Sequence, residues 1–230
     1  VGKSGLVGGI GLGIAMISFI YSITNTTAAI TLLCLAAMPF FTALLAFLFL
    51  KEKISLNVWI SMIIATVGII IMAVGNTEKN SLIGFVFGLT SSIGFSIFSV
   101  TLRWRKETPK FTTVAVAGLF CFVIATIMIL ANNQPFFATS YNSAMFSLHG
   151  IIVCLGLILY SIGSKAIQAA ELTLLSLTEV IGGIFWVWLP LFGINEIPST
   201  NPIVGGFFLF VSLIYYSLIM RWNKRYIALN

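Results

Sequence analysis

The segment AAITLLCLAAMPFFTALLAFLFLKEKIS, residues 28–55, decides the fold class of this chain. Its first 23 residues carry no charge, and Lys51, Glu52 and Lys53 follow directly. A helix needs about 20 apolar residues to cross the hydrocarbon of a bilayer, so this segment is long enough to span it. Pro39 lies near its middle and leaves one backbone carbonyl without its helical donor. Because lipid cannot satisfy a free carbonyl, we expect this side to face protein or an aqueous cavity. A kinked helix without functional role is the alternative.

The composition of the whole chain excludes a water-soluble domain. Of its 230 residues, 59% are hydrophobic and only 8% are charged, whereas soluble domains contain about 25% charged residues. Apolar segments recur at residues 6–23, 28–50, 56–74, 82–102, 111–131, 144–163, 172–192 and 203–220. Such long continuous runs are typical of membrane helices rather than of barrel strands. The sequence therefore predicts an all-α, polytopic transmembrane helical bundle with eight visible spans.

The distribution of basic residues predicts the orientation in the membrane. With eight crossings, the side on which the chain starts receives all basic residues except Lys79, which falls on the opposite side. Cytoplasmic loops of membrane proteins are enriched in Lys and Arg. We therefore expect a multi-pass protein of the plasma or inner membrane with both ends of this chain in the cytoplasm. The formal charge of +6 is explained by this topology and not by nucleic acid binding. The residues on the basic side are Lys3, Lys51, Lys53, Arg103, Arg105, Lys106, Lys110, Lys165, Arg221, Lys224 and Arg225.

Two stretches of the chain return later in the same order. Residues 28–33, AAITLL, resemble residues 169–175, AAELTLL, and residues 51–55, KEKIS, resemble residues 195–199, NEIPS. By the segment count the two copies cross the membrane in opposite directions, which is the pattern of an inverted repeat in many secondary transporters. We therefore predict that residues 1–75 belong to a first repeat and residues 82–222 to a second.

These stretches resemble the EamA-like family of the drug/metabolite transporter superfamily. Residues 39–52, PFFTALLAFLFLKE, are similar to the fourth helix of that family, and residues 84–105 to its sixth helix. Residues 177–180, LTEV, with residues 185–189, FWVWL, are similar to its ninth helix. The resemblance implies helices three to ten of a ten-helix transporter built from inverted five-helix repeats. It also implies two further helices before Val1, an expectation about the longer protein.

Glu179 is the strongest candidate for a functional residue, because it is the acidic residue placed deep inside an apolar segment. A carboxylate within the membrane costs a few kcal/mol or more and usually faces a cavity or a partner. On a helical wheel it shares a face with Ser176 and Trp186. We expect these three residues to line a central cavity, where Glu179 binds a cationic group or exchanges a proton. A packing role for Glu179 is the alternative.

Further residues are weaker candidates for the substrate or coupling site. Thr31 and Thr42 share a face of the helix that contains Pro39, and His149 shares a face with Tyr160, since eleven residues make about three helical turns. Threonine can also bond to its own helix, and a histidine that serves packing is favoured over a pore-lining one. Four small residues that recur at every fourth position indicate a close helix interface in preference to a ligand site: Gly84, Gly88, Ser92 and Ser96.

The sequence shows no pattern of a cofactor or metal site. Cys34, Cys121 and Cys154 stand separately within apolar runs and are expected to be small buried residues. The leading function is secondary transport of small metabolites, as exporter or permease, without enzymatic activity. A non-transporting packing or regulatory protein, or a remnant, is the alternative, and a membrane-embedded enzyme is less favoured. The expected partners are the lipid bilayer and a small-molecule substrate, and the sequence also allows protons as coupling ion and a homodimer.

Overall fold

The computed structural model describes residues 2–26, 28–74, 82–104, 110–136, 139–188 and 200–229, and every regular element within these ranges is a helix. The predicted all-α fold is therefore confirmed. The elements are α1 (Gly2–Asn25), α2 (Ala28–Leu35), α3 (Met38–Leu45), the π-helix η1 (Ala46–Leu50), α4 (Leu56–Val74), α5 (Leu82–Trp104), α6 (Lys110–Ala131), α7 (Ser140–Gly163), α8 (Ala169–Leu175), α9 (Leu177–Trp188) and α10 (Thr200–Leu229).

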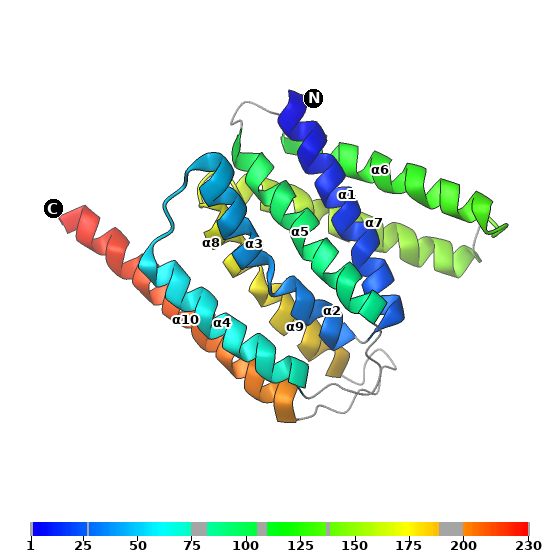
Figure 1. Ribbon diagram of the computed structural model, residues 1–230. Helices are drawn as coiled ribbons and strands as arrows, with labels where there is room; N and C mark the ends of the chain where they lie inside the picture. Colours follow the sequence, from blue (N-terminus) through cyan, green and yellow to red (C-terminus); the bar gives the residue numbers. More distant parts are fainter. Residues whose placement is uncertain are drawn as a thin grey trace.

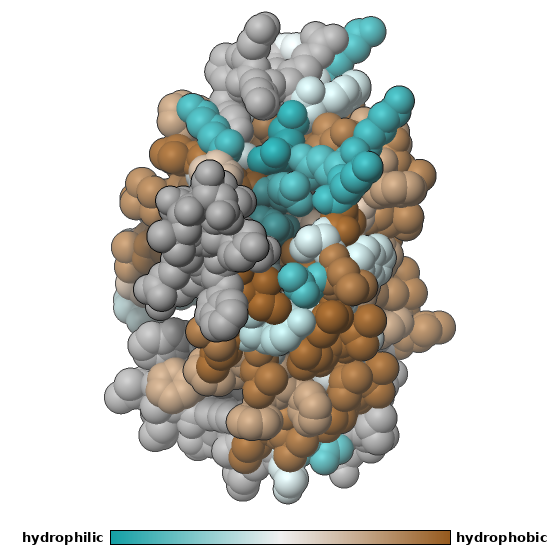
Figure 2. Space-filling model, turned by 90° about the vertical axis from the view of Figure 1, so that its left-hand side faces the viewer, coloured by the Kyte–Doolittle hydropathy of each residue, from teal (hydrophilic) through white to brown (hydrophobic). Residues whose placement is uncertain are grey.

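Four of the described helices are long and apolar enough to cross a membrane by themselves: α1, α5, α6 and α7. Shorter apolar runs occur at Met38–Leu50, Leu56–Gly68 and Ile203–Tyr216. Figure 2 shows hydrophilic residues gathered toward one end of the face in view and a largely hydrophobic surface below them. This distribution is that of a helical bundle whose side is covered by lipid. The chain is a multi-pass membrane protein, while the predicted count of spans stays a prediction.

Two of the predicted spans are divided into half-helices, which corrects the prediction of a continuous segment in each. Residues 28–50 form α2, α3 and η1, with a break at Ala36 and Ala37. Pro39 lies in the first turn of α3, where a missing backbone donor is tolerated, so the break precedes the proline. The predicted segment 172–192 instead begins with α8 at Ala169 and is interrupted at Ser176.

The two broken helices lie side by side and run in opposite directions. Helix α3 packs against α8, and α2 packs against α9 (Figure 1). The chain thus passes from α2 to α3 in one broken helix and from α8 to α9 in the reverse direction in the other. Both interruptions lie within the bundle, where neighbouring helices can bind the backbone groups that an interruption exposes.

Helix α5 supplies these hydrogen bonds at the first break. The hydroxyl of Ser92 donates to the carbonyl of Cys34. The Ser96 hydroxyl lies 3.1 Å from the Met38 carbonyl and 2.7 Å from the Ser92 carbonyl of its own helix, so its one proton is shared between these two acceptors. On the neighbouring face, the Ser91 hydroxyl donates to the Ala15 carbonyl of α1 at 2.8 Å. The Cys34 carbonyl also accepts the Ala37 amide at 3.1 Å, so the serines add a second donor at the break and hold it against α5.

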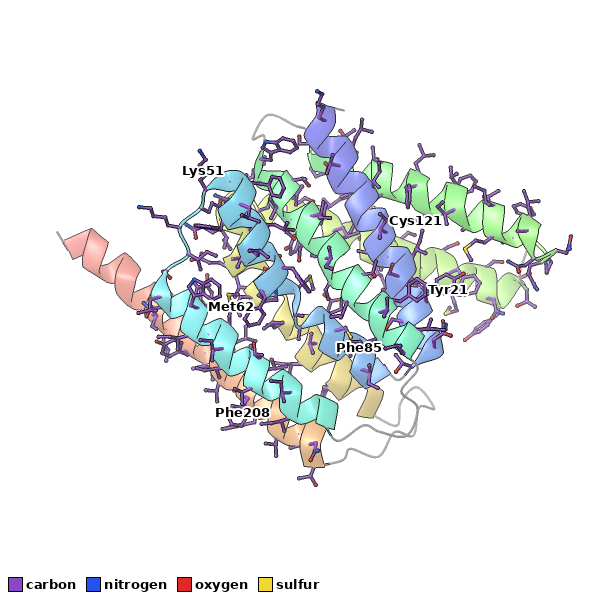
Figure 3. The ribbon with its side chains drawn as sticks, in the orientation of Figure 1. Tyr21, Lys51, Met62, Phe85, Cys121 and Phe208 are labelled. Carbon is purple, nitrogen blue, oxygen red and sulfur yellow. The ribbon has the colours of Figure 1, made fainter. Side chains whose placement is uncertain are left out.

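The outer helices differ in how much of their surface is covered. Helix α4 packs along α10 (Figure 1), and the Ser212 hydroxyl donates to the Ser61 carbonyl across this pair at 2.7 Å. Met62 of α4 is fully buried in the largest apolar cluster, and Figure 3 shows its position. By contrast, only 11% of the apolar window of α6 and 6% of that of α7 are buried. Most of the α7 surface is therefore exposed in the described structure.

Candidate substrate and coupling site

The candidate site is formed where α5, α7 and the break between α8 and α9 approach one another. The Tyr160 hydroxyl of α7 and the Ser99 hydroxyl of α5 are 2.7 Å apart and share a hydrogen bond. The Tyr160 ring lies edge-on to Phe95 with 5.1 Å between ring centroids, and it stacks on Phe98 at 5.9 Å. The Tyr160 side chain is thereby held in one orientation by a polar contact at its tip and aromatic contacts along its ring.

Glu179 adds a carboxylate to this group. It is exposed, and it lies close enough to Tyr160 for the two side chains to interact electrostatically. Helix α9 begins at Leu177, so Glu179 lies in the first turn of a new helix rather than in the interior of a long one. This corrects the predicted setting of the residue. The positive end of the helix dipole favours a carboxylate in that turn, which lowers the cost of a charge at this depth.

Ser176 marks the interruption that places Glu179. Its hydroxyl donates to the Thr173 carbonyl of α8 at 2.7 Å, and its own carbonyl accepts the Glu179 amide at 2.9 Å. Ser176 therefore closes α8 and opens α9, and its hydroxyl is occupied by backbone. Trp186, the third residue of the predicted stripe, belongs to α9, but its side chain lies outside the described part of the structure.

The predicted residues of the first broken helix are buried in the bundle. Thr31, Pro39 and Thr42 are all fully buried. The Thr31 hydroxyl lies 2.9 Å from that of Ser22 in α1, which indicates a role in joining α2 to α1. The Thr42 hydroxyl oxygen has no hydrogen-bond partner among the described residues. Thr42 thus offers an unused donor and acceptor on the inner face of α3.

The structure separates His149 from the rest of the candidate site. His149 is exposed on α7, eleven residues before Tyr160, which corresponds to about 16 Å along a helix axis. Gly84, Gly88, Ser92 and Ser96, by contrast, are all buried on α5. A Cβ atom at Gly88 would lie 2.7 Å from that of Cys34, so α2 and α5 are in close contact there.

Sequence reasoning missed Ser99, which continues this face of α5. Ser92, Ser96 and Ser99 follow each other at spacings of four and three, the period of one helical face. Intervals of three or four residues along the helix, in place of four alone, include Ser99 in this face. No partner of Tyr160 could be identified in this way, because the contact joins residues 61 positions apart.

The described residues contain no group of three His, Cys, Asp or Glu side chains that could hold a metal ion. The three cysteines are free thiols, but they differ in exposure: Cys34 is buried, Cys121 is intermediate and Cys154 is exposed. The expectation of a buried residue is therefore wrong for Cys154, because it lies on the largely uncovered surface of α7.

Comparison with known proteins relates this architecture to transporters. A protein of Helicobacter pylori strain J99 named as an uncharacterized transporter is 28% identical over 130 residues, which are 56% of this chain and 44% of that protein. A Clostridium kluyveri protein with the same description is 26% identical over 225 residues, 93% of this chain and 71% of its own length. A pseudopaline exporter of Pseudomonas aeruginosa is 23% identical over 212 residues, covering 91% and 72%.

A solved crystal structure has the same fold, with a TM-score of 0.70 and 16% identity over 93% of this chain and 77% of that chain. The chain spans less than half the length of the Helicobacter relative. Residues 2–74, which contain α1, the first broken helix and α4, match the EamA-like transporter family. The resemblance of this chain to the EamA-like transporter family is therefore confirmed.

Proposed function

We propose that this chain belongs to a secondary transporter of small metabolites in which two inverted repeats give alternating access to a central site. The observation that carries the proposal is the antiparallel pair of broken helices, α2–α3 and α8–α9, with a carboxylate in the first turn after the second break. Interrupted helices that meet near the midplane are the usual binding elements of secondary transporters.

In this proposal Glu179 is the residue that binds a cationic group of the substrate or exchanges a proton. Glu179 is an exposed residue, and its carboxylate receives no hydrogen bond from the described side chains. An exposed carboxylate at this depth is stable only if it faces water or a polar ligand rather than lipid. Tyr160 lies beside it with its ring fixed by Phe95 and Phe98, and an aromatic face next to a carboxylate favours an ammonium group.

The names of the relatives support transport as the proposed function. Two are named as uncharacterized transporters, and a third as a pseudopaline exporter. A small solute with at least one amine fits the carboxylate and aromatic side chains of the candidate site.

The proposal is tested in membrane vesicles that contain the protein and a pH-sensitive dye. A panel of amino acids and polyamines is added under an imposed pH gradient, and solute-dependent proton movement is recorded. We expect a response that Glu179→Gln abolishes, because the amide keeps the shape and hydrogen bonding of the side chain but cannot titrate. Glu171→Gln is the control for the loss of a carboxylate, since this acid lies in the other half of the same broken helix and interacts with Tyr216, Glu52 and Arg103 rather than with Tyr160.

Folding is checked by the yield and elution profile of each purified variant. If Glu179→Gln folds and its solute-dependent proton movement equals that of the parent, Glu179 is structural and the proposed coupling is wrong. If no solute of the panel produces a response above that of empty vesicles, the proposed substrate class is wrong.

A further inference from the structure

An ion pair joins three separate segments at the basic end of the bundle. The Nε of Arg103, at the end of α5, donates to Oε1 of Glu52 at 2.7 Å. A second guanidinium nitrogen of Arg103 donates to the Ser164 carbonyl at 3.1 Å and to the Ile167 carbonyl. These acceptors belong to the connection after η1 and to the turn between α7 and α8. One side chain therefore links α5 to both broken helices.

A small apolar cluster lies directly beneath this ion pair. Ala46, Val100 and Ala169 are buried together, with Leu45 and Leu50 packed against them. The cluster consists of one residue from each segment that Arg103 connects: η1, α5 and the start of α8. Val100 precedes Arg103 by three residues and so lies on the same face of α5, one turn deeper. We call these three residues the plug.

The backbone around Glu52 is shaped for this contact. Lys51 ends η1 in the left-handed region at φ 54°, and the Glu52 amide donates back to the Ala46 carbonyl at 3.3 Å. A non-glycine residue in this region is uncommon, and both strained residues and π-helical turns occur preferentially at functional sites. The turn directs the chain back over the plug, and Figure 3 shows Lys51 at this end of the bundle.

The exposure of the ion pair suits repeated breaking. The Arg103 side chain is 22% exposed and that of Glu52 is 15% exposed, so water reaches both charges when they separate. Because both side chains are mostly covered, the pair lies between an exposed ion pair, which contributes little net stability, and a deeply buried pair, which is strongly destabilised when one partner leaves. The plug is formed of small and medium apolar side chains, and its parts can separate without breaking side-chain hydrogen bonds.

We propose that Arg103 and Glu52 form the latch of a gate, which holds the plug closed at the basic end of the transporter. This inference rests on the proposed transport function, because a gate requires α3–η1 and α8 to separate during the cycle. The described structure represents the state in which this end is closed. When Arg103 releases Glu52 and the two carbonyl groups, the broken helices separate and the plug opens to the basic side.

The proposal is tested by the reactivity of a thiol within the plug. Val100→Cys is introduced after replacement of Cys34, Cys121 and Cys154, since cysteine is smaller than valine and Val100 is only 4% exposed. A membrane-impermeant maleimide is then applied to vesicles from the side of Arg103. In the parent this thiol should react slowly, because the latch holds the plug closed.

Arg103→Gln and Glu52→Gln should each increase the labelling rate about fivefold, the population change expected for the loss of a partly exposed ion pair. Lys53→Gln is the matched control: Lys53 is an exposed charge at the same end, and its loss should leave the rate unchanged. If both latch variants fold and label at the parent rate, the ion pair is a structural contact and the proposal is wrong.

Glu52→Gln keeps the two carbonyl contacts of Arg103, so it decides the question if Arg103→Gln does not fold. The labelling rate requires no substrate and no proton movement. If the latch variants label faster and Glu179→Gln keeps the solute-dependent proton movement of the parent, the coupling mechanism is therefore refuted and the gate is not. If the latch variants label at the parent rate and Glu179→Gln loses the solute-dependent proton movement, the gate alone is refuted.

Discussion

The contact between α1 and α5 allows a quantitative prediction for Gly94→Ala. A Cβ atom at Gly94 would lie 2.6 Å from the Gly11 carbonyl oxygen and 3.0 Å from the Ala15 amide nitrogen. Both are backbone atoms, so they cannot move aside without moving α1. An ordinary contact begins at 3.4 Å, which requires the helices to separate by about 0.8 Å, the difference between 3.4 and 2.6 Å.

A gap of about 0.5–1 Å forfeits a quarter to a half of the dispersion energy of the contacts that it opens. Together with the strain of added volume in a well-packed interface, we expect Gly94→Ala to destabilise the folded protein by about 1–3 kcal/mol. The melting temperature in detergent, followed by loss of the monodisperse elution peak, measures this effect.

Gly118→Ala is the matched control, because nothing lies within 4 Å of a Cβ atom at that position on α6. Alanine is also the better helix former by roughly 1 kcal/mol in water, so this variant should be neutral or slightly stabilised. If Gly94→Ala melts at the same temperature as Gly118→Ala, α1 and α5 are not in the close contact described, and the reasoning is refuted.

Three further predictions concern hydrogen bonds and topology. Tyr160→Phe removes the bond to Ser99 and should lower stability by about 1 kcal/mol, measured as a lower melting temperature; no change would contradict the bond. Ser96→Ala removes the shared hydrogen bond from α5 to the Met38 carbonyl and should cost about 0.5–1.5 kcal/mol; an unchanged melting temperature would exclude this role. Single cysteines at Asn133 and Lys165 should react with an impermeant reagent from opposite sides of the membrane, with Lys165 on the cytoplasmic side; reversed sides would overturn the predicted orientation.

The fold class and the leading candidate residue could be predicted from local sequence signals. Uninterrupted apolar length identifies membrane helices because each helix satisfies its own backbone groups in lipid. Glu179 was recognisable because a carboxylate is costly in such a segment. Its place in the first turn of α9 was not recognisable, since the interruption at Ser176 involves neither proline nor glycine.

The candidate site was predicted only in part for the same reason. The sequence placed His149 and Tyr160 on one face of a helix, but the structure brings only Tyr160 to Glu179. Distance along the helix axis separates the two residues although they share a face. The periodicity of a helix specifies the direction in which a side chain leaves the helix axis. The contacts that this side chain makes depend on which other helices pack against the helix at that position along its axis.

The sequence by itself determined that this chain is an all-α membrane protein with a proline near the middle of one apolar segment and an acid within another. Only the tertiary structure decided which groups meet: Ser96 with the backbone of α3, Ser99 with Tyr160, and Arg103 with Glu52. The physical reason is the separation along the chain over which each kind of interaction acts. Hydropathy and backbone hydrogen bonding act within one helix, whereas these contacts join residues 51 to 61 positions apart and exist only once the helices have packed.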